Sequence, residues 1–169
     1  MSRNEEKLTI RELRASALGV LGTGVLLAGA AVYPARQEWF SEFLTPLGIA
    51  WLAGGSSLIL GSFPTFAHVF AFSLLTFLAG GRRPALAIVA PLLWVAVNLV
   101  FELGQHTAVA TPLASWFYQH LPGGPGDLFA DYFELGTFDV ADAVAGLAGG
   151  AMAHLVLRHA LQGPPSEQA

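Results

Sequence analysis

Six polar residues suited to proton transfer or ligand binding lie in or beside otherwise apolar stretches of this chain. They are His68, Asn98, Glu102, Gln105, Asp139 and Asp142. Carboxylates and imidazoles can accept, donate or relay protons, and amides can hold the polar atoms of a ligand. An ionisable side chain at the centre of a bilayer costs about 2.5–3.5 kcal/mol on insertion scales. Each therefore needs a partner or a function.

The spacing of these residues predicts that three helices bring them together. Asn98, Glu102 and His106 are four residues apart and share one helix face. Asp139 and Asp142 are three residues apart and share a face of a second helix. His68 stands near the start of a third helix. If these faces point inward, they form one polar cluster beneath the outer membrane surface.

Each member of the cluster also has a local structural interpretation. Asp139 and Asp142 could occupy the first turn of a helix, where acids favour the helix dipole. Glu102 could lie at the water boundary, and His68 could be a satisfied histidine of the core. Convergence from three helices favours the shared site over these separate roles.

A metal ion at the cluster is a weaker alternative. Its ligands would be His68, Glu102, His106 and Asp139. Such nitrogen and oxygen ligands suit zinc or manganese, but a proton shared between carboxylates meets the same electrostatic need. We expect no metal and no cofactor. The absence of Cys excludes iron–sulfur clusters and thiol catalysis, and His68 and His154 lie too far apart along their spans to hold one haem.

The composition indicates a membrane protein. Of 169 residues, 12% are charged and 54% are apolar, and the mean hydropathy is +0.56. A soluble domain carries about 25% charged residues, so a soluble enzyme domain and a disordered chain are both disfavoured. The net charge of −4 argues against a nucleic-acid partner.

The pattern of apolar stretches predicts an all-α fold. We expect a polytopic membrane helical bundle of four transmembrane helices, with short interfacial helices in the outer loops. The spans are predicted at about 15–33, 63–79, 84–104 and 140–160, within a single membrane domain over 15–161, and the outer loops at 34–62 and 105–139. We expect the first span to be retained, because a signal-peptide core has about 7–15 residues.

The basic residues predict the orientation. Four spans with both termini in the cytoplasm place seven of the eight Lys and Arg residues on the inner side of a cell membrane. The uncharged run over 43–81 could instead hold two spans. That alternative would move Arg82 and Arg83 to the outside, so the charge distribution disfavours it.

Several shorter elements are also predicted. Residues 1–14 are predicted to form an amphipathic cytoplasmic helix. A capping box at Thr9 to Glu12 would start the helical turns that run into the first span. Residues 44–62 would form an interfacial or re-entrant segment, and 162–169 a flexible tail. In the second outer loop we expect one helix beginning at Thr111 and Pro112 and another over Asp127–Leu135, with 122–126 as the hinge.

The last span carries a helix-packing pattern. Gly146 and Gly150 are four residues apart, which lets another helix approach closely. Asp142 and His154 extend the same stripe by one turn in each direction. We interpret the stripe as packing within the bundle, with a homodimer contact as the weaker alternative.

Three segments together resemble the VanZ-like family of small integral membrane proteins. They are PTFAHVFAFSLL (64–75), FELGQ (101–105) and GTFDVADAVAGLAGG (136–150). The resemblance covers about 63–157 and rests on the order and spacing of the segments. Family members often carry Asp-Lys before the histidine and Arg before the Phe-Asp pair. Pro64, Thr65 and Gly136 stand at these positions here, so the cluster lacks the cations that would hold an anion.

The resemblance implies a membrane protein and supplies no activity. We expect a non-enzymatic role, in which the polar cluster binds a membrane lipid, another amphiphile or a membrane partner at the outer leaflet. One alternative is an enzyme on a lipid of the cell envelope, with Glu102, Asp139 or Asp142 as general base and His68 as proton carrier. Another is an accessory subunit that binds other membrane protein subunits in a larger complex.

Overall fold

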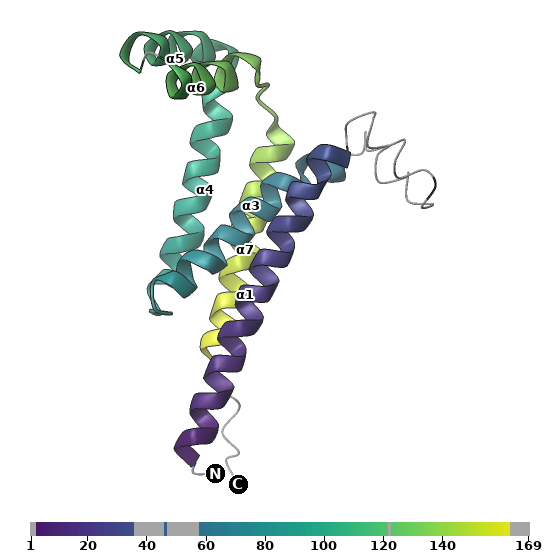
Figure 1. Ribbon diagram of the computed structural model, residues 1–169, viewed down its shortest axis with the longest axis vertical. Coiled ribbons are helices and arrows are strands. Elements are labelled where there is room, and N and C mark those ends of the chain that lie inside the picture. Colours follow the sequence, from purple (N-terminus) through teal and green to yellow (C-terminus); the bar gives the residue numbers. More distant parts are fainter. Residues whose placement is uncertain (1–2, 36–45, 47–57, 122, 163–169) are drawn as a thin grey trace.

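The chain folds into helices, as the computed structural model in Figure 1 shows. The structure describes residues 3–35, 46, 58–121 and 123–162. Its helices are α1 (Arg3–Ala35), α3 (Leu58–Ala79), α4 (Leu86–Gly104), α5 (Thr107–His120), α6 (Gly124–Leu135) and α7 (Val140–Leu161). This described part contains no strand, so the predicted all-α class is confirmed.

Four of these helices are long and apolar enough to cross a membrane. The segments that meet this criterion are Glu12–Val32 in α1, Gly61–Ala79 in α3, Leu86–Gly104 in α4 and Val140–Leu161 in α7. They correspond to the four predicted spans and fit a multi-pass membrane protein. The predicted segment 44–62 lies largely outside the described residues, and its last five residues belong to α3.

Helix α3 is the centre of the bundle. It packs against α1, α4 and α7, and α4 also packs against α7. Half of the apolar segment of α3 is buried, compared with 17% for α1, 22% for α4 and 28% for α7. The outer helices therefore direct most of their apolar side chains away from the protein, as helices in contact with lipid do.

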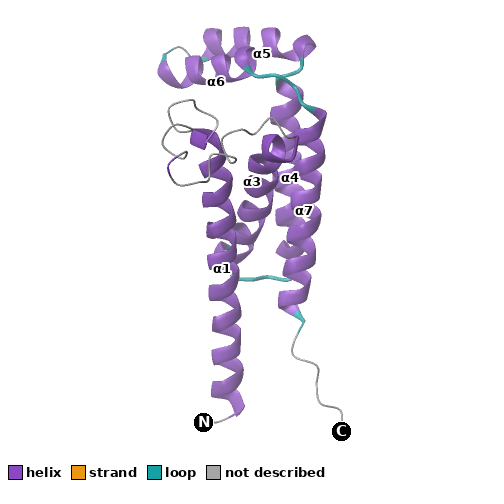
Figure 2. Ribbon diagram, turned by 90° about the vertical axis from the view of Figure 1, so that its right-hand side faces the viewer, coloured by secondary structure: helices purple, strands orange, loops and turns teal. Residues whose placement is uncertain are grey.

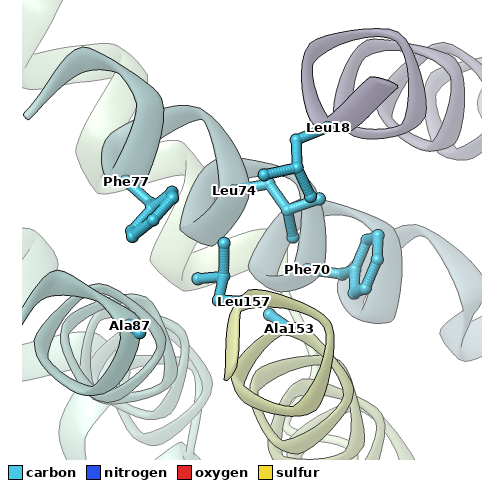
Figure 3. Packing of buried hydrophobic residues seen from close by; sticks show 7 residues of the cluster. All are labelled: Leu18, Phe70, Leu74, Phe77, Ala87, Ala153 and Leu157. Atoms are coloured by element: carbon cyan, nitrogen blue, oxygen red, sulfur yellow. The ribbon is translucent and has the colours of Figure 1, made fainter. Parts of the chain in front are cut away.

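The core lies where three helices meet α3. Its buried members are Leu18 from α1, Phe70, Leu74 and Phe77 from α3, Ala87 from α4, and Ala153 and Leu157 from α7 (Figure 3). Small residues allow the close crossings around it. A Cβ atom at Gly29 of α1 would lie 2.6 Å from the Cβ atom of Ala67, so these two helices are nearly in backbone contact.

Helices α4 and α7 run antiparallel and pack along one stripe. Near the start of α4, His154 Nδ1 lies 2.8 Å from the carbonyl oxygen of Ala87. Gly150 then faces the side chain of Val95, and Gly146 faces that of Asn98. The predicted stripe on the last span is therefore the surface that contacts α4.

Helix α3 ends in a tight turn, which begins the connection to α4. The amide of Gly81 donates to the carbonyl of Leu78 (3.1 Å), and that of Arg82 donates to the carbonyl of Phe77 (2.9 Å). This is the Schellman pattern of a helix C-terminus, and Gly81 takes the required left-handed conformation with φ 75°. Arg82 is also left-handed, with φ 61°. From this turn the two helices diverge (Figure 1).

Helices α5 and α6 form a hairpin that lies across one end of the bundle, and the first turns of α1 lie at the other end, toward which α7 also runs (Figures 1 and 2). We call these the hairpin end and the termini end. Phe133 of α6 anchors the hairpin. It is buried, stacks on Phe101 and Phe117 at centroid distances of 5.8 Å, and covers Gly104 at the end of α4.

Several predicted helix starts are wrong. Helix α1 is already helical from Arg3, so Thr9 lies inside the helix and does not begin it. Helix α5 begins at Thr107 rather than Thr111, because the ring of His106 accepts a hydrogen bond from the amide of Ala108 and caps the helix. The predicted hinge at 122–126 is shorter, since α6 starts at Gly124.

Candidate functional site

An open cavity of about 250 Å³ lies between the diverging helices α3 and α4. Its wall on α3 carries His68, Val69 and Phe72, its wall on α4 carries Trp94, Val97, Asn98 and Phe101, and Tyr132 of α6 completes it. The Schellman turn that separates α3 from α4 and the hairpin that contacts α4 therefore define its position. The lining combines aromatic surface with a few polar groups, as ligand sites usually do.

A stack of rings forms one wall of the cavity. The rings of His68 and Phe72 are nearly parallel, with centroids 5.9 Å apart, and Phe72 stacks on Trp94 at 4.7 Å. The indole N–H of Trp94 donates to the hydroxyl of Thr76 (2.9 Å). This hydrogen bond holds the indole of Trp94 in one orientation within the wall.

Asn98 is a polar residue in the lining of the cavity. Its Nδ2 atom is buried and, among the described residues, has no hydrogen-bond partner. The same atom lies against Gly146 of α7, where a Cβ atom would overlap it. A buried amide donor without a partner loses about 1–3 kcal/mol. Rotation of the Asn98 side chain away from Gly146 and toward the cavity would let an acceptor oxygen on a bound molecule recover this loss.

Three acids converge beside the cavity, at the hairpin end of α4 and α7. Glu102 is only 7% exposed, and its Oε2 atom accepts a hydrogen bond of 3.4 Å from the backbone amide of Asp139. Asp142 lies close enough to Glu102 to interact with it electrostatically. Its Oδ1 atom is buried and has no hydrogen-bond partner in the described part of the chain.

Asp139 has the local role that the sequence left open. Its Oδ1 atom accepts the amide of Ala141 at 2.8 Å and caps the N-terminus of α7. Asp142 lies in the first turn of the same helix. A carboxylate that already caps a helix is less available as a proton acceptor for a substrate.

The structure divides the predicted cluster into two adjacent groups. His68 and Asn98 line the cavity, whereas Glu102, Asp139 and Asp142 do not line it. The three acids instead form the junction between two helices. The predicted convergence of α4 and α7 is therefore present, but the histidine belongs to the cavity wall.

The two remaining candidates support the hairpin. The side chain of Gln105 lies against Gly136, where a Cβ atom would meet its amide at 2.6 Å. His106 caps α5 and packs edge-on against Phe138, with centroids 5.6 Å apart. Among the residues that the structure describes, no three His, Cys, Asp or Glu side chains are grouped to hold a metal ion. The geometry thus gives no support to the alternative metal site.

Sequence reasoning missed the aromatic wall. Phe72 stands four residues after His68, and Trp94 stands four before Asn98. Residues four apart share a helix face, so this spacing could have identified both as neighbours of the polar candidates. Tyr132 comes from the hairpin, and no spacing within the spans points to it.

The chain has the fold class of a multi-helix membrane bundle with a mixed aromatic and polar cavity. Comparisons of the chain with family models, curated proteins and solved structures find no match.

Proposed function

We propose that this chain is a VanZ-like integral membrane protein that binds a lipid or another amphiphile without converting it. The observation that carries the proposal is the cavity at the hairpin end, with a stacked aromatic wall and the amide of Asn98, which has no hydrogen-bond partner among the described residues. Aromatic faces would hold the apolar part of the ligand, and the amide of Asn98, rotated from α7 toward the cavity, would donate to its polar part.

The size of the cavity defines what enters. A volume of about 250 Å³ is below the 300–1,000 Å³ typical of drug-sized ligands. One portion of an amphiphile therefore fits, such as the linkage between a head group and a chain. The rest of the molecule would stay in the surrounding membrane, with which an open cavity between spanning helices communicates.

The position of the acids favours binding over catalysis. An enzyme on an envelope lipid would need a general base within about 2.6–3.2 Å of the reacting group. Glu102, Asp139 and Asp142 do not line the cavity, and Asp139 is occupied in capping α7. His68 alone would have to carry the proton transfers, and its ring is stacked within the wall.

Fluorescence from Trp94 tests the proposal directly, because this indole lies in the cavity wall. The other three tryptophans, Trp39, Trp51 and Trp116, would be replaced by Phe. A brominated single-chain phosphocholine would then be titrated into the protein in unbrominated detergent micelles. We expect quenching that saturates at one amphiphile per chain.

Matched variants identify the site. Val97→Phe fills the cavity and should abolish the saturable quenching. Val100→Phe adds the same ring to the same helix at a position that is 66% exposed and outside the cavity, and should leave the quenching unchanged. Quenching that rises without saturation, or that survives Val97→Phe, would refute the proposal.

A further inference from the structure

A second cavity, with a volume of about 270 Å³, lies between α1 and α7 toward the termini end. Both helices pack on α3, and the cavity opens where they face one another. Five of its seven lining side chains are apolar, and the other two are Arg14 and His159. This combination of an apolar floor and a basic rim differs from the aromatic cavity at the hairpin end.

Arg14 is held across the rim. Its Nη1 atom donates to the carbonyl oxygen of Gln162, just beyond the end of α7, at 2.7 Å. A guanidinium has five N–H donors, so this contact leaves donors for another acceptor. Within the described residues Arg14 forms no ion pair with a carboxylate, and the carbonyl that it contacts is neutral. Its charge therefore remains available to an anion.

The depth of the two basic residues matches that of lipid head groups. The apolar segment of α1 begins at Glu12 and that of α7 ends at Leu161, so Arg14 and His159 each lie within one turn of a span's end. Leu18 and Leu21 lie further along α1, toward the membrane interior. A charged rim at the interface above an apolar groove is the arrangement expected for a charged lipid.

We propose that this cavity binds an anionic phospholipid. The phosphate accepts hydrogen bonds from Arg14 and His159, and the first carbons of one acyl chain lie along Leu18 and Leu21. The apolar lining favours a lipid over a soluble phosphate, because a free anion gains nothing from that surface. The site is separate from the cavity at the hairpin end and does not depend on the function proposed for it.

Native mass spectrometry of the purified full chain in uncharged detergent micelles tests the site. Three probes would be compared: dioleoyl phosphatidylglycerol, dioleoyl phosphatidylcholine and glycerol phosphate. We expect phosphatidylglycerol to bind about fivefold more tightly than phosphatidylcholine, the factor expected for one basic residue facing an anionic lipid. Glycerol phosphate, which lacks acyl chains, should show no binding.

Variants separate a built site from general charge attraction. Arg14→Gln should remove the preference for phosphatidylglycerol. Arg83→Gln removes an exposed charge from the α3–α4 connection, outside the cavity, and should keep the preference. Ala160→Phe should weaken lipid binding by filling the groove while leaving Arg14 in place. This variant still tests the site if Arg14→Gln does not fold.

Four results would overturn the proposal. Equal affinities for the two lipids would remove the anionic selectivity. Equal losses in Arg14→Gln and Arg83→Gln would show nonspecific attraction, and unchanged binding in Ala160→Phe would place the lipid elsewhere. Tight binding of glycerol phosphate alone would identify an anion site without a lipid.

Discussion

The amide side chain of Asn98 in α4 lies directly on the backbone of Gly146 in α7. A Cβ atom at position 146 would overlap Asn98 Nδ2 and lie 3.0 Å from its Cγ atom. The glycine therefore allows a polar side chain of the cavity to pass between two helices. Gly146, which was predicted to pack against another helix, and Asn98, which was predicted to bind a ligand, thus contact each other.

The glycines of α7 should differ in their tolerance of alanine. A Cβ atom at Gly149 would lie 2.6 Å from the backbone oxygen of Phe66, which cannot move without displacing α3. At Gly146 the obstacle is the end of a side chain, which can rotate. We expect Gly149→Ala to lower the free energy of unfolding by about 1–3 kcal/mol, the usual cost of overpacking, and Gly146→Ala to lower it by less.

Gly24→Ala is the control for this pair. No atom lies within 4 Å of a Cβ atom at Gly24, and alanine favours a helix by about 1 kcal/mol over glycine. Its stability in detergent should equal or exceed that of the parent. If Gly146→Ala proves more costly than Gly149→Ala, the rotation of Asn98 is not available and the packing argument is wrong.

Asp142→Asn should retain or raise the stability of the protein. The change removes a negative charge near the buried Glu102 while keeping the shape of the side chain. Asp142→Leu should lower stability and expression, because the neighbouring polar groups lose a polar contact. Thermal unfolding in detergent measures both, and Asp127→Asn at an exposed position of α6 is the control. A leucine variant as stable as the parent would assign Asp142 to the helix boundary alone.

Gly81→Ala should destabilise the protein by about 1–2 kcal/mol, the cost of a left-handed conformation for a residue with a Cβ atom. The φ of 75° at Gly81 closes the Schellman turn, and a Cβ there meets no atom within 4 Å. The cost is therefore conformational and not steric. Asparagine tolerates this conformation better, so Gly81→Asn should cost less than Gly81→Ala in chemical unfolding. Equal costs would contradict a conformational origin.

The hairpin contains a tyrosine that should titrate late. Tyr118 of α5 donates a hydrogen bond of 2.9 Å to Asp131 of α6. This bond, together with nearby negative charge, raises the pKa of Tyr118 above its usual value. The fold favours the protonated form, so the stabilisation is complete below the unfolded pKa of about 10 and is lost as pH rises through the higher folded pKa.

Absorbance at 295 nm follows this titration. The difference between the parent and Tyr118→Phe isolates the residue, and Asp131→Asn should move its titration back toward the ordinary range. Glu134→Gln should have a smaller effect, since Glu134 acts on Tyr118 only through its charge. Titration of Tyr118 at the ordinary value in the parent would exclude the hydrogen bond in solution.

Because the chain has no native cysteine, single cysteines can test the predicted orientation. Arg83→Cys lies in the α3–α4 connection, and Ser115→Cys lies on the exposed surface of α5. If both termini are cytoplasmic, a membrane-impermeant maleimide added to intact cells should label position 115 and spare position 83. Labelling of position 83 from outside would reverse the orientation.

The spans could be predicted from sequence because they depend on composition. Long uncharged stretches bounded by Arg14, Arg82 and Arg83 indicate helix ends without any tertiary information. The convergence of Glu102 with Asp139 and Asp142 was also accessible, because residues at spacings of three or four share a face. Pairwise contacts between helices follow from such periodicity when each helix has one polar face.

The details that depend on close packing were not accessible. Leu128 and Leu135 are seven residues apart and so share a face of α6, yet these large apolar side chains are 70% and 82% exposed. The packed face instead carries Gly126, Ala130 and Phe133. Small residues allow α6 to approach α5 more closely than large residues do. The hydrophobicity of the side chains alone therefore does not predict which face of α6 packs against α5.

The antiparallel register of α4 and α7 has a mechanical consequence for the hairpin. The hairpin is tethered to α4 at Gln105 and to α7 at Gly136, and these two tethers touch. Sliding one helix along the other would disrupt the Gly146 contact and the His154 hydrogen bond together. Any motion of the hairpin must therefore bend these tethers, because contacts along the length of α4 and α7 oppose sliding of one helix past the other.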